Sequence, residues 1–282
     1  MKKLVAILLV LVLCVSACTY AEEDWVCPNC GAENTHDFCG DCGTKKPTWT
    51  CPNCGCENVR KFCEYCGAKN PYIEVGDIVT LGTYAGKPIE WQVLEDKGDG
   101  TYVLLSVMGL DMKQYNTELT DVTWETCTLR AWLNSKFYET AFSESEKGKI
   151  VLSTVENPDN KTFGTKGGNT TKDYVYLLSL DEIGRYFRVD PYNLEGSEAL
   201  ICLPTKTAVN HGAYTVSQAE VDEGQSEYSY LLKTGACVWW LRSPGEGQNW
   251  AVAVYFDGIV YFDGGDVYTT GVCVRPVVCA RL

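Results

Sequence analysis

The sequence predicts an α+β protein in which one large, mostly antiparallel domain follows two small metal-binding units. Three observations carry this prediction. A cysteine motif occurs twice before residue 70, short runs of aromatic and β-branched residues alternate with turn signals, and a few segments repeat apolar residues at helical spacing. The length of 282 residues allows one large domain plus a small one, and we place the large domain at residues 74–282.

The N-terminus has the pattern of a secretory signal. Two lysines precede the apolar run 4–15, which is too short to span a membrane because a spanning helix needs about 20 apolar residues. Ordinary cleavage would remove residues 1–21, whereas a lipobox that ends at Cys18 would leave the chain lipidated. We favour ordinary cleavage because the next motif follows too closely for a flexible tether. Both outcomes predict a secreted or cell-surface bacterial protein that meets a membrane only through export or a lipid anchor.

Residues 25–70 contain one cysteine motif twice, at 27–43 and at 51–67, each time as Cys-x2-Cys, eight residues and Cys-x2-Cys. Four thiolates at this spacing suit a tetrahedral Zn²⁺, so we predict two zinc ribbons with one structural ion each. Units this short cannot bury a core, and metal binding would therefore supply their folding energy. The predicted ligands are Cys27, Cys30, Cys39, Cys42, Cys51, Cys54, Cys63 and Cys66.

A disulfide framework is the alternative for these cysteines, because exported cysteines tend to oxidise. Metal is favoured because a glycine follows every second cysteine, where a knuckle turn needs positive φ, and because the repeat keeps its spacing. Four cysteines fill each site, so Cys56 and His36 are expected to be bystanders. A saturated site leaves no open coordination position for catalysis. The expected role is that of a spacer or a protein-contact module.

The large domain is expected to begin with an antiparallel meander of strands at 74–81, 88–95 and 102–106. The middle strand alternates apolar and polar residues, which places Ile89, Trp91 and Val93 on one face. The next elements are a helix at 123–134 capped by Thr123 or Asp121, a helix from 143, a strand at 149–155, a loop at 157–173, a strand at 174–178, a helix at 179–187 and an irregular region at 188–235.

Three apolar runs near the C-terminus, at 237–245, 249–263 and 271–278, are expected to be strands. Asp257-Gly258 predicts a two-residue hairpin turn, and with that turn Val254 would face Tyr261. Both faces of this hairpin are apolar, so it should be covered on both sides.

Five motifs in this order resemble a bacterial family known as domain of unknown function 6273. They are Trp91-Gln-Val-Leu94, the segment 123–134, the segment 176–182, Trp239-Trp-Leu-Arg-Ser-Pro-Gly245 and Val274-Arg-Pro276. The resemblance covers nearly the whole chain after the cysteine motifs. It implies a C-type-lectin-like fold, as in formylglycine-generating enzymes and the hypervariable proteins of diversity-generating retroelements. In those relatives an Arg-containing strand, a hairpin and a final Gly-x-Arg strand build the ligand-facing end.

No catalytic set emerges from the sequence. The calcium motifs of true C-type lectins are absent, and no cysteine pair matches that of the formylglycine-generating enzymes. His211 lies in a loop without an adjacent nucleophile motif, which is more often structural than catalytic. Five further cysteines are expected to be core residues, and one or two disulfides among them stay open as an alternative: Cys127, Cys202, Cys237, Cys273 and Cys279.

The ligand-facing end implied by the resemblance contains aromatic residues beside Asn and Asp, which suit sugar stacking or a protein hot spot. Arg242 and Arg275 interrupt apolar strands there, and a buried ion pair with Glu125 or Asp181 is the favoured interpretation over an anion contact. The candidate ligand-binding residues are Asn249, Trp250, Tyr255, Asp257, Tyr268 and Arg242.

These observations favour an exported binding protein with a protein or glycan ligand. The chain has 37 acidic against 24 basic side chains, which argues against nucleic acid as a partner because phosphate binding rests on Lys and Arg. Two alternatives stay open. One is an enzyme that uses the loops 157–173 and 188–235 with His211 or Arg242, and the other is an architectural protein that assembles through zinc.

Overall fold

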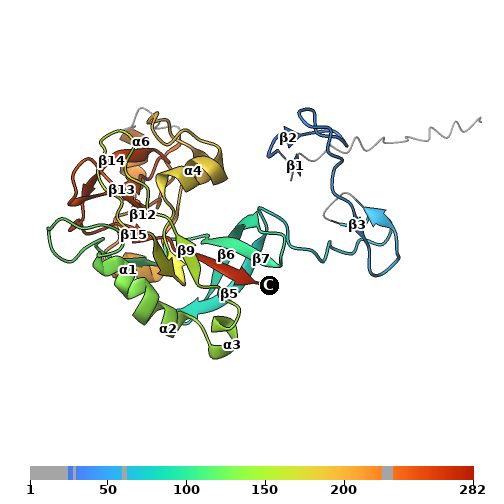
Figure 1. Cartoon of the computed structure of the whole chain (residues 1–282), viewed down its shortest axis with the longest axis horizontal. Helices are drawn as coiled ribbons and strands as arrows, with labels where there is room; N and C mark the ends of the chain where they lie inside the picture. The colour runs from blue at the N-terminus through green and yellow to red at the C-terminus, as the bar shows by residue number, and fades with distance from the viewer. Residues whose placement is uncertain (1–24, 28–29, 59–61, 224–230) are drawn as a thin grey trace, which may run out of the picture. The chain divides into compact units, whose positions relative to one another are not determined.

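The computed structural model describes residues 25–27, 30–58, 62–223 and 231–282. The chain divides into two compact units, Met1–Ile73 and Glu74–Leu282 (Figure 1). The predicted signal peptide and Cys18 lie outside the described residues. Within the described residues, every helix is too short or too polar to span a bilayer.

The small unit contains one ribbon twice. Each ribbon is a pair of two-residue antiparallel strands, which are β1 (Trp25–Val26) with β2 (Glu33–Asn34), and β3 (Trp49–Thr50) with β4 (Glu57–Asn58). The backbone hydrogen bonds repeat as well. The N–H of Cys27 donates to the carbonyl of Ala32, and that of Cys51 donates to the carbonyl of Cys56, both at 2.8 Å. The two ribbons therefore share one backbone arrangement.

The large unit has mixed α and β structure, with sheets that are mostly antiparallel, as the sequence predicts. Its first sheet contains, in spatial order, β11 (Val175–Tyr176), β16 (Val277–Arg281), β7 (Thr101–Ser106), β6 (Lys87–Asp96) and β5 (Ile78–Tyr84). The predicted meander is confirmed, since β5, β6 and β7 are neighbours. Ile89, Trp91 and Val93 are all at most 1 % exposed. Figure 1 shows the C-terminal strand β16, in red, running beside these strands.

The second sheet contains, in spatial order, β14 (Val260–Asp266), β13 (Trp250–Val254), β12 (Trp239–Pro244), β15 (Cys273–Val274) and β8 (Asp111–Met112). The pairing of β12 with β15 is parallel and the others are antiparallel. The run 271–278, predicted as one strand, splits into β15 and β16, which belong to different sheets. Pro276 lies at the split, because proline cannot donate to a strand ladder.

The predicted hairpin joins β13 and β14, but its predicted register is wrong. Val254 pairs with Val260 rather than with Tyr261, and the connection is the five-residue loop 255–259. A tertiary contact explains the longer loop. Gly258 packs on the backbone of Ser197, where a Cβ would lie 2.0 Å from the carbonyl oxygen. Propensity for a two-residue turn does not take such a contact into account.

A continuous helical segment packs against the first sheet. It consists of α1 (Thr128–Trp132), a π-helical turn η1 (Leu133–Phe137) and α2 (Tyr138–Ala141). Leu129, Leu133 and Phe137 are buried, as their helical spacing predicts. The cap differs from the prediction, because the segment 124–127 forms turns and the helix begins after Cys127. The Sγ of Cys127 accepts a hydrogen bond from the N–H of Arg130 at 3.4 Å.

Two short helices lie where the sequence predicts them, and each begins with a capping box. They are α3 (Glu144–Lys147), capped by Ser143, and α4 (Leu180–Phe187), capped by Ser179. In each box the serine side chain accepts from a backbone N–H three residues later, and the glutamate there accepts from the serine N–H.

The remaining described elements are short. They are β9 (Ser153–Val155), β10 (Thr171–Asp173), a 3-10 turn η2 (Glu198–Leu200), α5 (Lys206–Asn210) and α6 (Gln218–Glu223). The strand predicted at 149–155 is therefore limited to its last three residues. In the predicted loop 157–173, the buried Asn160 donates to the carbonyls of Pro244 and Phe262, which attaches the loop to the second sheet.

Candidate functional site

Each ribbon places four cysteine sulfurs together in the geometry of a metal site. The sulfurs of Cys27, Cys30, Cys39 and Cys42 all lie within 4.8 Å of one another, and so do those of Cys51, Cys54, Cys63 and Cys66. The closest pairs are 3.4 Å and 3.5 Å apart. A tetrahedron with Zn–S bonds of about 2.3 Å has sulfur edges of about 3.8 Å, whereas a disulfide bond is about 2.05 Å long. Both groups could hold a metal ion, and they are consistent with zinc.

In the ribbons, backbone donors act to lower the pKa of the cysteine thiols, whereas burial and neighbouring sulfurs raise the pKa of Cys30 and Cys54 overall. The N–H of Ala32 donates to the sulfur of Cys30, and in the second ribbon the N–H of Cys56 donates to Cys54. Burial tends to raise the pKa of the Cys63 thiol, but backbone donors from Cys66 and Tyr65, together with the side chains of Cys54 and Cys66, lower this pKa to about 6. Metal binding requires the thiolate, so these donors favour the metal-bound form.

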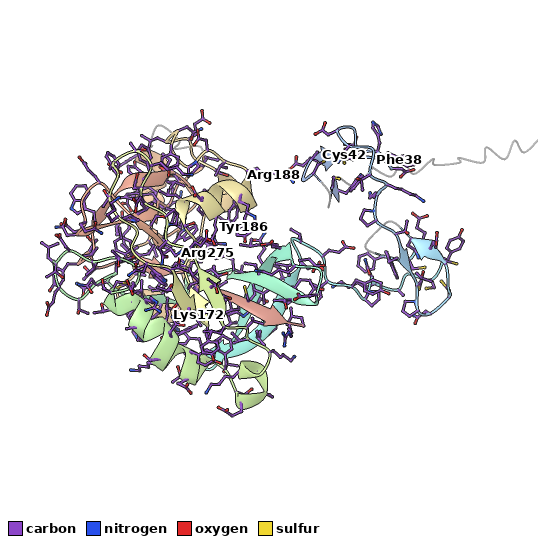
Figure 2. The ribbon with its side chains drawn as sticks, in the orientation of Figure 1. Phe38, Cys42, Lys172, Tyr186, Arg188 and Arg275 are labelled. Atoms are coloured by element: carbon purple, nitrogen blue, oxygen red, sulfur yellow. The ribbon has the colours of Figure 1, made fainter. Side chains whose placement is uncertain are left out.

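The two bystander residues of the ribbons lie outside the groups of four. Cys56 is equivalent to Ala32 of the first ribbon, and its side chain packs beside the cluster of Trp49, Cys51 and Cys63. His36 is exposed, and its carbonyl accepts a hydrogen bond from the indole of Trp25 at 2.6 Å. The side chain of Phe38 is 59 % exposed (Figure 2), and the equivalent Phe62 is 56 % exposed.

The six candidate ligand-binding residues lie in three places in the large unit. Asn249, Trp250 and Tyr268 lie at one end of the β13–β14 pair, where the carbonyl of Asn249 accepts from Val267. Tyr255 and Asp257 lie in the loop at the other end. The two ends are separated by the five residues of β13, a length of about 16 Å. Arg242 lies inside β12, so the structure does not bring the six together.

Half-buried aromatic side chains gather at the loop end of the hairpin. The rings of Tyr255 and Tyr261 are 4.0 Å apart, and Phe256 contacts both Tyr255 and Tyr214. Burial raises the pKa of Tyr255, and the carboxylates of Asp263 and Asp257 raise it further. Strand β14 is an edge of its sheet, so this group borders solvent. Sequence reasoning expected this hairpin to be covered on both sides, because alternation does not reveal which strand becomes an edge.

Arg242 is buried, at 4 % exposure, and its guanidinium is held by acceptors. It pairs with the carboxylate of Glu182 and donates to the carbonyls of Leu177, at 2.6 Å, and Glu156, at 3.0 Å. Glu182 belongs to the capping box of α4, which fixes its position. The interpretation as a buried ion pair therefore agrees with the contacts, but the partner is Glu182 and not Glu125 or Asp181.

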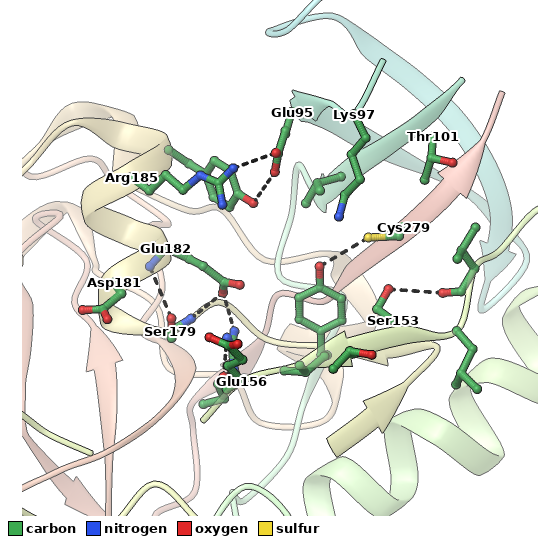
Figure 3. Close-up of a pocket in the computed structure, with 18 of the residues that line it drawn as sticks. Glu95, Lys97, Thr101, Ser153, Glu156, Ser179, Asp181, Glu182, Arg185 and Cys279 are labelled. Carbon is green, nitrogen blue, oxygen red and sulfur yellow. Dashed lines mark hydrogen bonds and ion pairs between the residues drawn. The ribbon is translucent and has the colours of Figure 1, made fainter. Parts of the chain in front are cut away.

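Arg242 also lines a pocket of about 590 Å³, which Figure 3 shows beside α4. Its walls are α4, the ends of β6, β7 and β16, and residues 151–156. Glu95 accepts from Arg185 at 2.6 Å and from the hydroxyl of Tyr186 at 2.8 Å, which joins α4 to β6 across the pocket. Its volume lies within the range of about 300–1,000 Å³ typical of ligand pockets. Of the residues that line this pocket, sequence reasoning named only Arg242 as a candidate ligand-binding residue.

A second polar cluster surrounds Asp111, which is 1 % exposed. Its carboxylate contacts His211 Nδ1 at 2.5 Å, accepts from the Tyr84 hydroxyl at 2.5 Å and lies 3.1 Å from Lys113 Nζ. Burial tends to raise the pKa of Asp111, but hydrogen bonds from Tyr84, His211 and Lys113 outweigh it and lower this pKa. No sequence motif predicts the cluster, because Asp111 and His211 are 100 positions apart.

Comparison with known proteins adds one finding. The model of a protein family described as Domain of unknown function (DUF6273) matches residues 99–281, which is more than half of the chain. The match includes every strand of the second sheet and leaves the cysteine ribbons outside. Neither a search of curated proteins nor a search of solved structures found a match.

Proposed function

The chain belongs to the DUF6273 family, and from this premise we propose that it is an exported bacterial binding protein. In this proposal two zinc ribbons precede a C-type-lectin-like domain, which binds a protein or glycan ligand through the hairpin of β13 and β14. The protein is secreted or held at the cell surface. The lectin-like fold rests on the family resemblance, and the export rests on the sequence of the N-terminus.

The observation that carries the binding function is the aromatic group at the loop end of the hairpin. Tyr255 and Tyr261 lie half-buried at an edge strand, with Asp257 and Asp263 close enough to raise the pKa of both tyrosines. Aromatic faces suit sugar rings, which stack on them, and they also suit protein hot spots. The carboxylate at this surface is that of Asp263, because Asp257 is 2 % exposed and accepts from the N–H of Ile259. The pairing of the rings at 4.0 Å holds this surface in one arrangement before a ligand arrives.

The test is binding of the mature, zinc-loaded protein to arrays of glycans and surface proteins. A Tyr255→Ala, Tyr261→Ala variant is expected to lose its hits, while a Trp250→Ala, Tyr268→Ala variant tests the other end of the hairpin. Tyr72→Ala is the matched control, because Tyr72 is an exposed tyrosine of the small unit. Hits that both hairpin variants keep, at unchanged melting temperature, would contradict the proposed site.

An enzyme is the second candidate, and the contact between His211 and the buried Asp111 favours it. A carboxylate on Nδ1 orients an imidazole so that its other nitrogen can act on a proton, and the His211 side chain is 50 % exposed. Turnover of a substrate that His211→Ala abolishes without loss of folding would support an enzyme. A Tyr214→Phe variant, which alters a neighbouring exposed side chain, is the control.

An architectural role is the third candidate, and the two exposed phenylalanines of the ribbons favour it. Phe38 and Phe62 occupy equivalent positions in the two ribbons. Phe38 forms an antiparallel β-bridge with Lys45, and Phe62 forms one with Lys69. Exposed aromatic side chains are typical of protein contacts. Zinc-dependent oligomers in light scattering that a Phe38→Ser, Phe62→Ser variant no longer forms would support this role.

A further inference from the structure

Three buried thiols meet beside the second sheet. Cys202, Cys237 and Cys273 are each at most 1 % exposed. Cys202 and Cys237 are antiparallel bridge partners, and the N–H of Cys237 donates to the carbonyl of Cys202 at 2.9 Å. Gly109 covers the group closely, since a Cβ there would lie 3.1 Å from Cys273 Sγ and 3.4 Å from Cys237 Sγ.

A buried cation with a spare donor lies beside these thiols. Arg275 is 4 % exposed (Figure 2), lies over the ring of Trp239 at 4.8 Å, and donates from Nε to the carbonyl of Ser106 at 2.9 Å. Among the described residues, its buried Nη1 has no hydrogen-bond partner. A cation without a carboxylate partner in a buried setting favours an anion nearby.

Cys202 is the thiol whose pKa this setting lowers, and its Sγ lies 3.6 Å from the carbonyl oxygen of Leu203. A hydrogen bond from Cys237 lowers the pKa of Cys202 to about 7, against the opposing effect of burial, and the charge of Arg275 and the N–H of Gly109 contribute. The same interaction raises the pKa of Cys237. A thiolate beside a thiol at neutral pH is the arrangement that thiol–disulfide exchange requires.

We propose that Cys202 and Cys237 are a redox-active pair that forms a disulfide by exchange with an external disulfide. Antiparallel partners have Cα atoms about 4.5–5.5 Å apart, within the range of about 4.4–6.8 Å that a disulfide spans. Cys273 pairs with Trp239 instead. Its Cα is therefore about 8 Å from that of Cys237, which is too far for a bridge without backbone movement.

The exchange balances without another reactant. Both thiols are buried, so the exchange takes place where local unfolding or refolding exposes them. The Cys202 thiolate attacks one sulfur of the external disulfide, which breaks and releases a first thiolate. Cys237 then gives up its proton and attacks the Cys202 sulfur, which releases a second thiolate. Two protein thiols have lost two electrons and two protons, and the external disulfide has become two thiols.

The disulfide would close a covalent loop of chain between Cys202 and Cys237, which includes α5 and α6. Cross-linking a loop of this length removes entropy from the unfolded chain. We expect the oxidised large unit to melt about 5–10 °C above the reduced one.

The test uses the full zinc-loaded chain with oxidised glutathione, applied both to the native protein and during refolding. Free thiols are then alkylated, and peptide mapping by mass spectrometry locates the links. The expected result is a link between the peptides of Cys202 and Cys237, with Cys273 alkylated. A link of Cys237 to Cys273, or alkylation of both Cys202 and Cys237 under both conditions, would overturn the proposal.

Two variants complete the test. Cys279→Ser removes a buried thiol whose described polar neighbour is the hydroxyl of Tyr176, at 3.5 Å, and the Cys202–Cys237 link should persist in it. Arg275→Met keeps much of the side-chain volume but removes the charge. It should slow the exchange at pH 7 about tenfold and shift the pH profile of the rate upward, which a purely structural role of Arg275 would not do. Mapping of the unmodified chain decides the outcome if a variant fails to fold.

Discussion

The two units of the chain use cysteine for different purposes. In each ribbon the buried apolar cluster is small and consists of one tryptophan and two cysteines, which are Trp25, Cys27 and Cys39 in the first and Trp49, Cys51 and Cys63 in the second. The large unit buries its five cysteines within an extensive core of apolar side chains. A cluster of three side chains cannot offset the entropy of folding, whereas two sheets and their helices can. The contrast shows that spacing and surroundings, rather than residue type, decide what a thiol does.

Removal of metal should separate the two units most sharply. Structural zinc contributes an apparent binding free energy of about 10–16 kcal/mol to a small cysteine module, so a chelator or Cys51→Ser should unfold the second ribbon. The large unit should keep its melting temperature. Amide hydrogen exchange read by mass spectrometry checks this. In Cys51→Ser, protection should vanish in the peptides of residues 49–69 and persist in the first ribbon.

The chelator should remove protection from both ribbons, and metal analysis should find one ion per chain in Cys51→Ser against two in the unaltered protein. Retention of protection in the metal-free ribbons would show that apolar packing suffices, and the contrast between the units would fail.

The converse change removes core volume from the large unit. Trp91 is fully buried in the meander, stacks on Phe142 and donates from its indole to the carbonyl of Leu81 at 2.7 Å. Trp91→Ala should lower the free energy of unfolding by about 3–5 kcal/mol, because it leaves a cavity and an unpaired carbonyl. Urea denaturation measures the loss, and metal content should remain two ions.

Ile78→Ala in the adjacent strand is the control for this change. Ile78 is 52 % exposed, so the free energy of unfolding should change by less than about 1 kcal/mol. A comparable loss from both variants would mean that burial does not govern the stability of the meander.

The charge cluster of the large unit should have a smaller, pH-dependent effect. The folded pKa of Asp111 lies below its unfolded value of about 3.9, so its contribution is present above about pH 4 and is lost as pH falls through the folded pKa. Asp111→Asn should cost about 2–3 kcal/mol at neutral pH, since three donors lose a charged acceptor. In urea melts the free energies of unfolding of the two proteins should differ at pH 7 and converge at acid pH. Asp266→Asn, an exposed aspartate, should leave both melts unchanged.

Sequence reasoning succeeded where the determinants are local and failed where they are distant. The cysteine spacing, the alternation around Trp91 and the residues that predict the helix at 179–187 all lie within a few residues of the feature they predict. The hairpin register depends on the contact of Gly258 with Ser197, and the strand at 271–278 breaks at Pro276 to join two sheets. The Asp111 cluster joins positions 100 apart. Such features depend on topology, which periodicity and spacing do not determine.

The smallest expected effect comes from Cys56, the cysteine by which the two ribbons differ. It takes the place of Ala32 of the first ribbon, donates its backbone N–H to the sulfur of Cys54 and lies outside the group of four. Cys56→Ala keeps that N–H and converts the second ribbon to the residue of the first. The chain should therefore still bind two ions, and the free energy of unfolding should change by no more than about 0.5 kcal/mol. Metal analysis and hydrogen exchange check both expectations. Loss of an ion would mean that Cys56 exchanges with one of the four ligands. The two ribbons would then share their backbone arrangement but not their set of ligand sulfurs.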